Sequence, residues 1–192
     1  MTNSSARGRP IPNPSIDERI AEALIKLLHE QPLTEISVKE LCACAYVARS
    51  TFYAHFRNTD EVMQQIETSV VADLAAINEP LAEGARSTAA DFAFFQDTLD
   101  YLAEHREVMG VLLVERPSAR FSAAWKEAIK EHLLARRPLA IRTPEDDFAL
   151  DMAASAMVNA AAYFVEHDAE IDEEFARAAI ADVLAIMERP QS

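Results

Sequence analysis

The sequence predicts an all-α protein, with an N-terminal three-helix helix-turn-helix module followed by a C-terminal helical bundle, about nine helices in total. Apolar residues recur at helical spacing along most of the chain, and no segment shows sustained alternation of apolar and polar residues. The 192 residues include only three glycines, whereas Ala, Leu and Glu, which favour helices, are abundant. Half of the residues are apolar, which favours an ordered globular protein over a disordered one.

The N-terminal part is expected to comprise an arm and three short helices. Residues 1–14 combine Pro and Gly breakers with two arginines, and we expect a flexible arm there. Residues 15–18, Ser-Ile-Asp-Glu, form a capping box that starts the first helix, and Pro32 stops it. A second capping box at residues 37–40 opens the next helix. A four-residue break then separates that helix from a third one, which ends near Phe56.

Six further helices are expected after the third. Their apolar stripes run from Val62 to Ile77, Phe92 to Leu102, Val108 to Leu113, Phe121 to Leu133, Phe148 to Tyr163 and Phe175 to Ile186. At about 1.5 Å per residue, the first of these helices is on the order of 30 Å long and is expected to connect the N-terminal module to the bundle. Residues 143–146, Thr-Pro-Glu-Asp, are typical of a helix start, because they supply a capping hydroxyl, an early Pro and acids near the positive end of the helix dipole.

The net charge of −14 is unevenly distributed along the chain. Residues 1–60 carry seven basic and seven acidic residues, whereas residues 61–192 carry eleven basic and twenty-five acidic ones. An acidic protein is a poor partner for nucleic acid, because phosphate binding depends on Lys and Arg. A neutral module on an acidic body is nevertheless the distribution expected when the first module contacts nucleic acid and the rest does not.

The third helix carries the side chains that predict a nucleic-acid contact. Residues 49–56, Arg-Ser-Thr-Phe-Tyr-Ala-His-Phe, place cationic and hydrogen-bonding groups beside aromatic rings. The second helix of a helix-turn-helix enters the major groove of DNA. Arg49 can bind O6 and N7 of guanine or a phosphate, while Phe52 and Phe56 lie four residues apart and are expected in the core. The candidate DNA-binding residues are Ser37, Lys39, Arg49, Ser50, Thr51, Tyr53 and His55.

The N-terminal part of the chain resembles the DNA-binding domain of the TetR family of transcriptional regulators. Three features carry the resemblance: the arrangement of these helices, the run Thr-Phe-Tyr-Ala-His-Phe at 51–56, and the Asn-x-Asp-Glu opening of the fourth helix. The resemblance implies three parts: an arm at 1–14, a helix-turn-helix DNA-binding domain at 15–74, and an effector-binding and dimerisation domain at 75–192. It also implies that Tyr53 and His55 contact the DNA backbone. The segment from Phe95 to Leu113 resembles the C-terminal region of DhaS-like members.

The turn of the motif departs from the family pattern. Ala45-Tyr46-Val47-Ala48 stands where the family usually has Ala-Gly-Val-Ser. Tyr46 must therefore either avoid a positive φ angle or tolerate the strain. Ala48 lacks the hydroxyl that usually caps the recognition helix, a loss of about 1 kcal/mol. Thr59 replaces a Lys that is often present after the motif.

The resemblance further implies a homodimer that binds a palindromic operator in double-stranded DNA. The last two long helices, at about 144–167 and 172–188, would pair with their copies in the partner chain. The small residues Ala153, Ala154, Ala160 and Ala161 permit close helix approach, although they are equally suited to tight packing within one chain. Two recognition helices about 34–36 Å apart would reach successive major grooves.

A small-molecule effector, where one binds, would occupy a pocket among the fifth to eighth helices. The candidate lining residues are Phe92, Phe95, Trp125, Met152, Met157 and Tyr163, with Asn159 as a polar anchor. The alternative is that these side chains simply form the core. An effector would act by shifting the fourth helix, and with it the separation of the two recognition helices.

The remaining patterns predict no cofactor, metal or enzyme activity. Cys42 and Cys44 point to different sides of a helix, so a disulfide between them is geometrically poor, and a packed thiol is expected at Cys42. The chain shows no Gly-rich phosphate loop and no metal-binding or nucleophile motif. The lack of an apolar leader or membrane-spanning run in the sequence predicts a cytoplasmic protein.

The sequence therefore predicts a transcriptional regulator, and specifically a repressor released by a small molecule. One alternative keeps the fold but binds a partner protein as a coactivator, which the missing cap at Ala48 and the Thr59 substitution favour. A remote alternative is a helical-bundle enzyme. Arg49 and the neutral charge of the first module favour DNA.

Overall fold

The computed structural model describes residues 14–78, 88–136 and 143–167, together with residues 174, 178 and 179. All regular elements within these residues are helical, as the sequence predicts. In chain order they are α1 (Ile16–Glu30), η1 (Leu33–Glu35), α2 (Val38–Cys44), α3 (Arg49–His55), α4 (Thr59–Asn78), α5 (Thr88–Glu104), α6 (Arg106–Gly110), η3 (Val111–Glu115), α7 (Ala119–Arg136) and α8 (Pro144–His167). The predicted arm at 1–14 and ninth helix at 172–188 lie almost entirely outside the described residues.

The N-terminal caps expected from the sequence fix where the first helices begin. Ser15 and Glu18 form both halves of the capping box: the Ser15 amide donates to the Glu18 carboxylate at 2.6 Å and the Glu18 amide to the Ser15 hydroxyl at 3.1 Å. At α2 the Glu40 amide donates to the Ser37 hydroxyl at 3.2 Å. The Glu40 carboxylate instead accepts from the Gln31 side-chain amide at 2.6 Å. Of the two hydrogen bonds of the second capping box, the one to the Ser37 hydroxyl is therefore present and the one to the Glu40 carboxylate is not.

Local caps also open the later helices. The Asn58 side chain accepts from the Glu61 amide at 2.8 Å at the start of α4, and the Ser118 hydroxyl accepts from the Phe121 amide at 3.2 Å at the start of α7. Before α8, Thr143 accepts from the amide of Asp146 at 3.3 Å and donates its own amide to that carboxylate at 2.9 Å. Residues close in sequence satisfy these amides, which explains why the helix starts are readable from the sequence.

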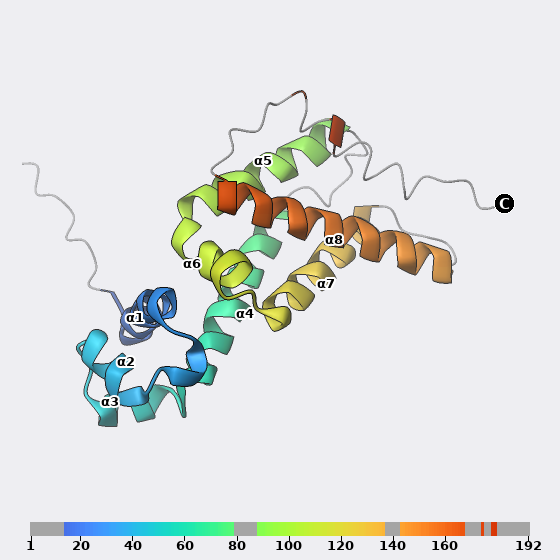
Figure 1. Ribbon diagram of the computed structural model, residues 1–192. Coiled ribbons are helices and arrows are strands. Elements are labelled where there is room, and N and C mark those ends of the chain that lie inside the picture. Colours follow the sequence, from blue (N-terminus) through green and yellow to red (C-terminus); the bar gives the residue numbers. More distant parts are fainter. Residues whose placement is uncertain (1–13, 79–87, 137–142, 168–173, 175–177, 180–192) are drawn as a thin grey trace, which may run out of the picture.

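The helices form two groups that α4 joins (Figure 1). Helix α1 packs against α2, and α2 against α3, to form the helix-turn-helix module. Helix α4 packs against α1 near one end, and against α5 and α7 in the body. In the body, α8 lies against α7, α5, α6 and η3, while η3 also reaches back to α1. The hydrophobic core is continuous from the module into the body.

Candidate nucleic-acid interface

Helix α3 is held in the module by its two phenylalanines. Phe52 and Phe56 are 0% and 3% exposed, and their rings lie 5.8 Å apart between centroids. The sequence prediction that both face the core is confirmed. Because these residues occupy the inner face, the opposite face of the seven-residue helix points to solvent.

The outer face of α3 carries the predicted DNA-binding side chains. Arg49, Ser50, Tyr53 and His55 are exposed, and Thr51 is partly buried at the edge. Tyr53 presents 59% of its surface to solvent while one edge of its ring contacts Phe52, at 5.5 Å between centroids. Polar and cationic groups are thus mounted on a rigid apolar base, which is the arrangement that positions a helix for groove contacts.

Helix α2 adds two predicted residues at its N-terminal end. Ser37 and Lys39 are both exposed. The Ser37 hydroxyl accepts a hydrogen bond from the Glu40 amide, and its own O–H can still donate to a phosphate. Within the described residues no carboxylate pairs with Lys39 or Arg49. Their charges are therefore not neutralised by an ion pair inside this part of the chain.

His55 is engaged within the module in a way that sequence reasoning missed. Its Nδ1 atom lies 2.6 Å from the Asp17 carboxylate, and both side chains are partly exposed. This contact connects the C-terminal end of α3 to the first turn of α1. Because Nδ1 faces Asp17, Nε2 is the ring nitrogen left for the predicted contact of His55 with the DNA backbone.

In the turn before α3, Tyr46 has the positive φ angle that was one of the two options left open by the sequence. Tyr46 has a φ of 53°, and it is the one non-glycine residue with a positive φ among those described. The Val47 amide donates to the Cys42 carbonyl at 3.0 Å and the Tyr46 amide to the Ala43 carbonyl at 3.3 Å. This pair of hydrogen bonds is a Schellman motif, which places the residue after the helix in the left-handed region, where glycine is usual.

An arginine from α1 holds this turn in place. The Arg19 guanidinium donates to the carbonyls of Ala45 and Tyr46, each at 2.7 Å. Ala48 is the N-cap residue of α3 and makes no side-chain cap, as its sequence predicts. The start of α3 is thus held by hydrogen bonds from Arg19 of α1 to the preceding turn rather than by a hydroxyl cap of its own.

The two cysteines are free thiols. Cys42 is buried, which confirms the predicted packed thiol, and burial raises its pKa although the nearby Arg49 opposes the shift. Cys44 is half-buried and points toward the Ala23 carbonyl at 3.9 Å. Among the described residues no cluster of three His, Cys, Asp or Glu side chains is placed to hold a metal ion.

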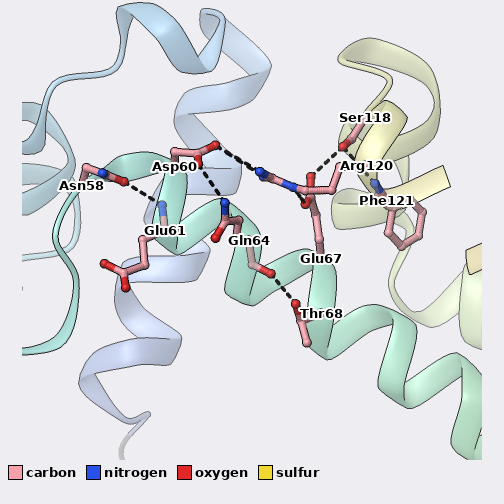
Figure 2. A network of polar contacts seen from close by, with 9 residues as sticks. All are labelled: Asn58, Asp60, Glu61, Gln64, Glu67, Thr68, Ser118, Arg120 and Phe121. Carbon is pink, nitrogen blue, oxygen red and sulfur yellow. Dashed lines mark hydrogen bonds and ion pairs between the residues drawn. The ribbon is translucent and has the colours of Figure 1, made fainter. Parts of the chain in front are cut away.

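A polar network connects the module's long helix α4 to the body (Figure 2). Glu67 is 4% exposed; one carboxylate oxygen accepts from the Ser118 hydroxyl at 2.6 Å and the other from Nε of Arg120. Arg120 also reaches Asp60 at 3.4 Å. The hydrogen bond to Glu67 is the main cause of a raised Arg120 pKa. The sequence signal for this network was a charged residue, Glu67, four residues after Met63 on the buried side of α4.

A second set of contacts joins α1 to α6 and to the end of η3. His29 Nδ1 lies 2.7 Å from the Glu115 carboxylate, and its Nε2 lies 3.8 Å from Glu107. Beside it, Nε of Arg116 donates to the carbonyl of Leu28 at 3.3 Å. The body therefore contacts the helix-turn-helix module at two places, through α4 and through α1.

Of the described side chains expected to line an effector pocket, Trp125 and Met157 border one small void, whereas Met152, Asn159 and Tyr163 are exposed. The side chains of Phe92 and Phe95 lie outside the described residues. Trp125 is 4% exposed in the core, beside a void of about 20 Å³ that is too small for an organic effector. Met157, which lines that void, is partly buried.

Three of the expected lining residues lie on the outer face of α8, which corrects the predicted orientation of that helix. Met152 and Tyr163 are 47% and 58% exposed, and Asn159 is exposed as well. The inner face instead carries Leu150, Ala153, Ala154, Val158, Ala161 and Val165. Small alanines allow the close approach of α8 to its neighbours, so the packing favours the alanine face inward and the larger side chains outward.

The same orientation decides between the two interpretations of the α8 alanines. Ala153, Ala154 and Ala161 are at most 5% exposed, packed within the chain, and only Ala160 of the four is exposed. Phe148, 68% exposed, extends the outer apolar face. By length and composition α8 is the one described helix that could cross a membrane, but 33% of the relevant window is buried in the fold.

Comparison with known proteins agrees with this geometry. Residues 20–66 match the family model described as bacterial regulatory proteins, tetR family. The HTH-type transcriptional regulator EthR of Mycobacterium tuberculosis (strain ATCC 25618 / H37Rv) is 34% identical over 97 residues, which cover 46% of this chain and 45% of EthR. The chain thus aligns with less than half the length of this curated relative.

Several solved structures share the fold over nearly the whole chain. The fatty acid degradation regulator FadR from Bacillus halodurans matches with a TM-score of 0.64 at 15% identity, covering 92% of this chain and 96% of FadR. The TetR family regulator PfmR from Thermus thermophilus matches with a TM-score of 0.64 at 22% identity, covering 93% and 100%. The dihydroxyacetone kinase operon activator DhaS matches with a TM-score of 0.60 at 19% identity, covering 90% and 96%. At these identities the likeness concerns the fold.

Proposed function

We propose that this chain, of which residues 20–66 match the model of the tetR family of bacterial regulatory proteins, is a cytoplasmic transcriptional repressor that binds a palindromic operator as a homodimer. The observation that carries the proposal is the outer face of α3. That face presents Arg49, Ser50 and Tyr53 on a helix anchored by two buried phenylalanines. Lys39 at the start of α2 adds a cation for the flanking phosphates.

The outer face of α8 supports the homodimer. Phe148, Met152 and Tyr163 leave apolar surface in solvent, and such surface is usually covered by a partner. A second copy that pairs along α8 would cover this face in both chains. Two recognition helices held in this way read two half-sites, so that a short seven-residue helix suffices for specific binding.

Relief by a small molecule is the finer part of the proposal, and the two contact sets between body and module support it. Glu67 with Arg120, and His29 with Glu115, join the body to α4 and α1. A ligand that favours a different arrangement of the body must alter these contacts, and it shifts DNA affinity by no more than its preference for that arrangement.

Selection of duplexes from a random DNA library tests the proposal. We expect an enriched palindrome whose affinity falls as salt rises, because the contact releases counterions from phosphates. Arg49→Ala should cost about 1–3 kcal/mol and relax preference at one base position, whereas Lys39→Ala should weaken all duplexes alike and lower the salt slope by about 1. Lys126→Ala, on α7 of the body, is the matched control and should change neither.

Failure to enrich any duplex would exclude the repressor and favour the coactivator alternative. Salt-insensitive residual binding would do the same, because it would mean that no phosphate is contacted. An Arg49→Ala variant with unchanged affinity and specificity would remove the recognition helix from the interface.

A further inference from the structure

Tyr46 has an unfavourable backbone conformation, and its side chain is not packed against the rest of the fold. Its φ of 53° lies in the left-handed region, which is less favourable for a bulky residue than for glycine. The side chain is 88% exposed, the largest exposure among the large apolar and aromatic residues of the described chain that stand out in solvent. Its hydroxyl makes no hydrogen bond within the described residues. Packing therefore does not offset the strain.

The backbone around Tyr46 is nevertheless held firmly. The Schellman hydrogen bonds that end α2 and the two bonds from Arg19 fix the residue from both sides. A strained residue persists when its surroundings over-determine it, and such residues concentrate at binding sites. The phenol ring is thus a large side chain on a rigid mount rather than the tip of a loose loop.

The surroundings of the turn point to an anionic partner. The turn leads into α3, whose first residue, Arg49, is exposed, and the Arg19 guanidinium lies against the carbonyls of Ala45 and Tyr46. Tyr46 lies two residues before Ala48, the uncapped start of the recognition helix. A tyrosine hydroxyl is a donor, and tyrosines are among the side chains that bind DNA phosphates.

From these observations we infer that Tyr46 is a further DNA-contact residue, whose hydroxyl donates to a backbone phosphate beside the groove that α3 enters. This inference rests on the proposed DNA binding. The contact positions the recognition helix without reading sequence.

Two substitutions at this one position separate the contact from the strain. Tyr46→Phe removes the hydroxyl and keeps the ring and the backbone conformation. Tyr46→Gly removes the side chain and relieves the left-handed conformation. The probe is the duplex that the wild-type protein enriches from a random library, with a second duplex that carries one altered base in each half-site. Fluorescence anisotropy gives Kd, and thermal unfolding gives the midpoint for each protein.

For Tyr46→Phe we expect Kd to rise about 3- to 10-fold on both duplexes alike, because one hydrogen bond to a charged group is lost and no base is read. The salt slope should stay the same, since a neutral hydroxyl releases no counterion. The thermal midpoint should also stay the same. For Tyr46→Gly we expect at least the same rise in Kd together with a midpoint about 1–3 °C higher, as strain relief outweighs the added entropy of the unfolded chain.

The outcomes distinguish this inference from the proposed function. If wild type enriches no duplex, both are wrong. If wild type binds but both variants keep its Kd, Tyr46 does not contact DNA while the repressor proposal stands, and a protein partner becomes the explanation for the exposed ring. If the ratio of the Kd values for the two duplexes changes in Tyr46→Phe, the assignment of the hydroxyl to a phosphate is wrong. A lower midpoint in Tyr46→Gly would overturn the strain argument.

Discussion

Removal of the Arg120 side chain tests whether the network between α4 and α7 stabilises the fold. Arg120→Ala leaves the Glu67 carboxylate, 4% exposed, with the Ser118 hydroxyl as its remaining donor in the network. Removing one partner of a fully buried ion pair costs about 3–5 kcal/mol. Arg120 itself is 46% exposed, and its loss would admit water to the carboxylate. A charge-assisted hydrogen bond contributes about 1.5–3 kcal/mol, so we expect a loss of about 2 kcal/mol.

Arg57→Ala is the matched control, because Arg57 also pairs with a carboxylate of α4. Its partner Glu61 lies 3.3 Å away, four residues along the chain, and the Arg57 side chain is 89% exposed. An exposed pair of this kind contributes about 0.3–0.5 kcal/mol. For a chain of this length, 1 kcal/mol corresponds to a shift of about 2–4 °C in the thermal midpoint. We therefore expect a decrease of about 4–8 °C for Arg120→Ala and of about 1–2 °C for Arg57→Ala.

Thermal and urea unfolding of wild type, both single variants and a double-mutant cycle with Glu67→Ala would measure these quantities. In the Glu67→Ala background, Arg120→Ala should cost less than half of what it costs in wild type, because its principal partner is already gone. Equal losses for Arg120→Ala and Arg57→Ala would refute the reasoning. Additivity within about 0.5 kcal/mol in the cycle would refute it as well.

Three further outcomes follow from the structure. Ala48→Ser should restore a hydroxyl cap to α3 and raise the free energy of unfolding by about 1 kcal/mol, measured by urea denaturation. Met152→Glu should place a charge in the α8 face and convert the dimer to monomer in light scattering; a retained dimer would contradict that interface. Cys44 should react with a disulfide reagent at about pH 8 before Cys42, whose raised pKa keeps the buried thiol protonated.

The helix starts could be predicted from the sequence because the groups that determine them are local. Ser15 with Glu18 and Thr143 with Asp146 lie three residues apart, and each pair forms the expected cap. The strain at Tyr46 could be predicted as one of two options, because the sequence shows that the turn lacks the usual glycine but not whether φ is positive.

The orientation of α8 could not be predicted, because the helix has apolar side chains on both faces. The stripe through Met152 and Tyr163 has the helical spacing expected of a core, yet the alanines opposite pack more closely against the body. The partners of Glu67 could not be predicted either, because Ser118 and Arg120 lie 51 and 53 residues away in sequence. Which distant residues meet depends on how the helices pack, and local sequence patterns do not predict that packing.

The outer face of α8 favours a second copy of the chain over a lipid phase. Asp151 lies next to Met152 and is exposed, with its carboxylate 3.4 Å from Lys130 of α7. Insertion of the helix into a bilayer would have to desolvate that charge, at a cost of several kcal/mol, together with the acids of its first turn. A paired helix can instead cover Phe148, Met152 and Tyr163 while it leaves the carboxylates at a wet rim, which is the usual anatomy of a protein interface. The acids that border the apolar stripe therefore limit how α8 can be covered, and they favour the homodimer that places two recognition helices on one DNA.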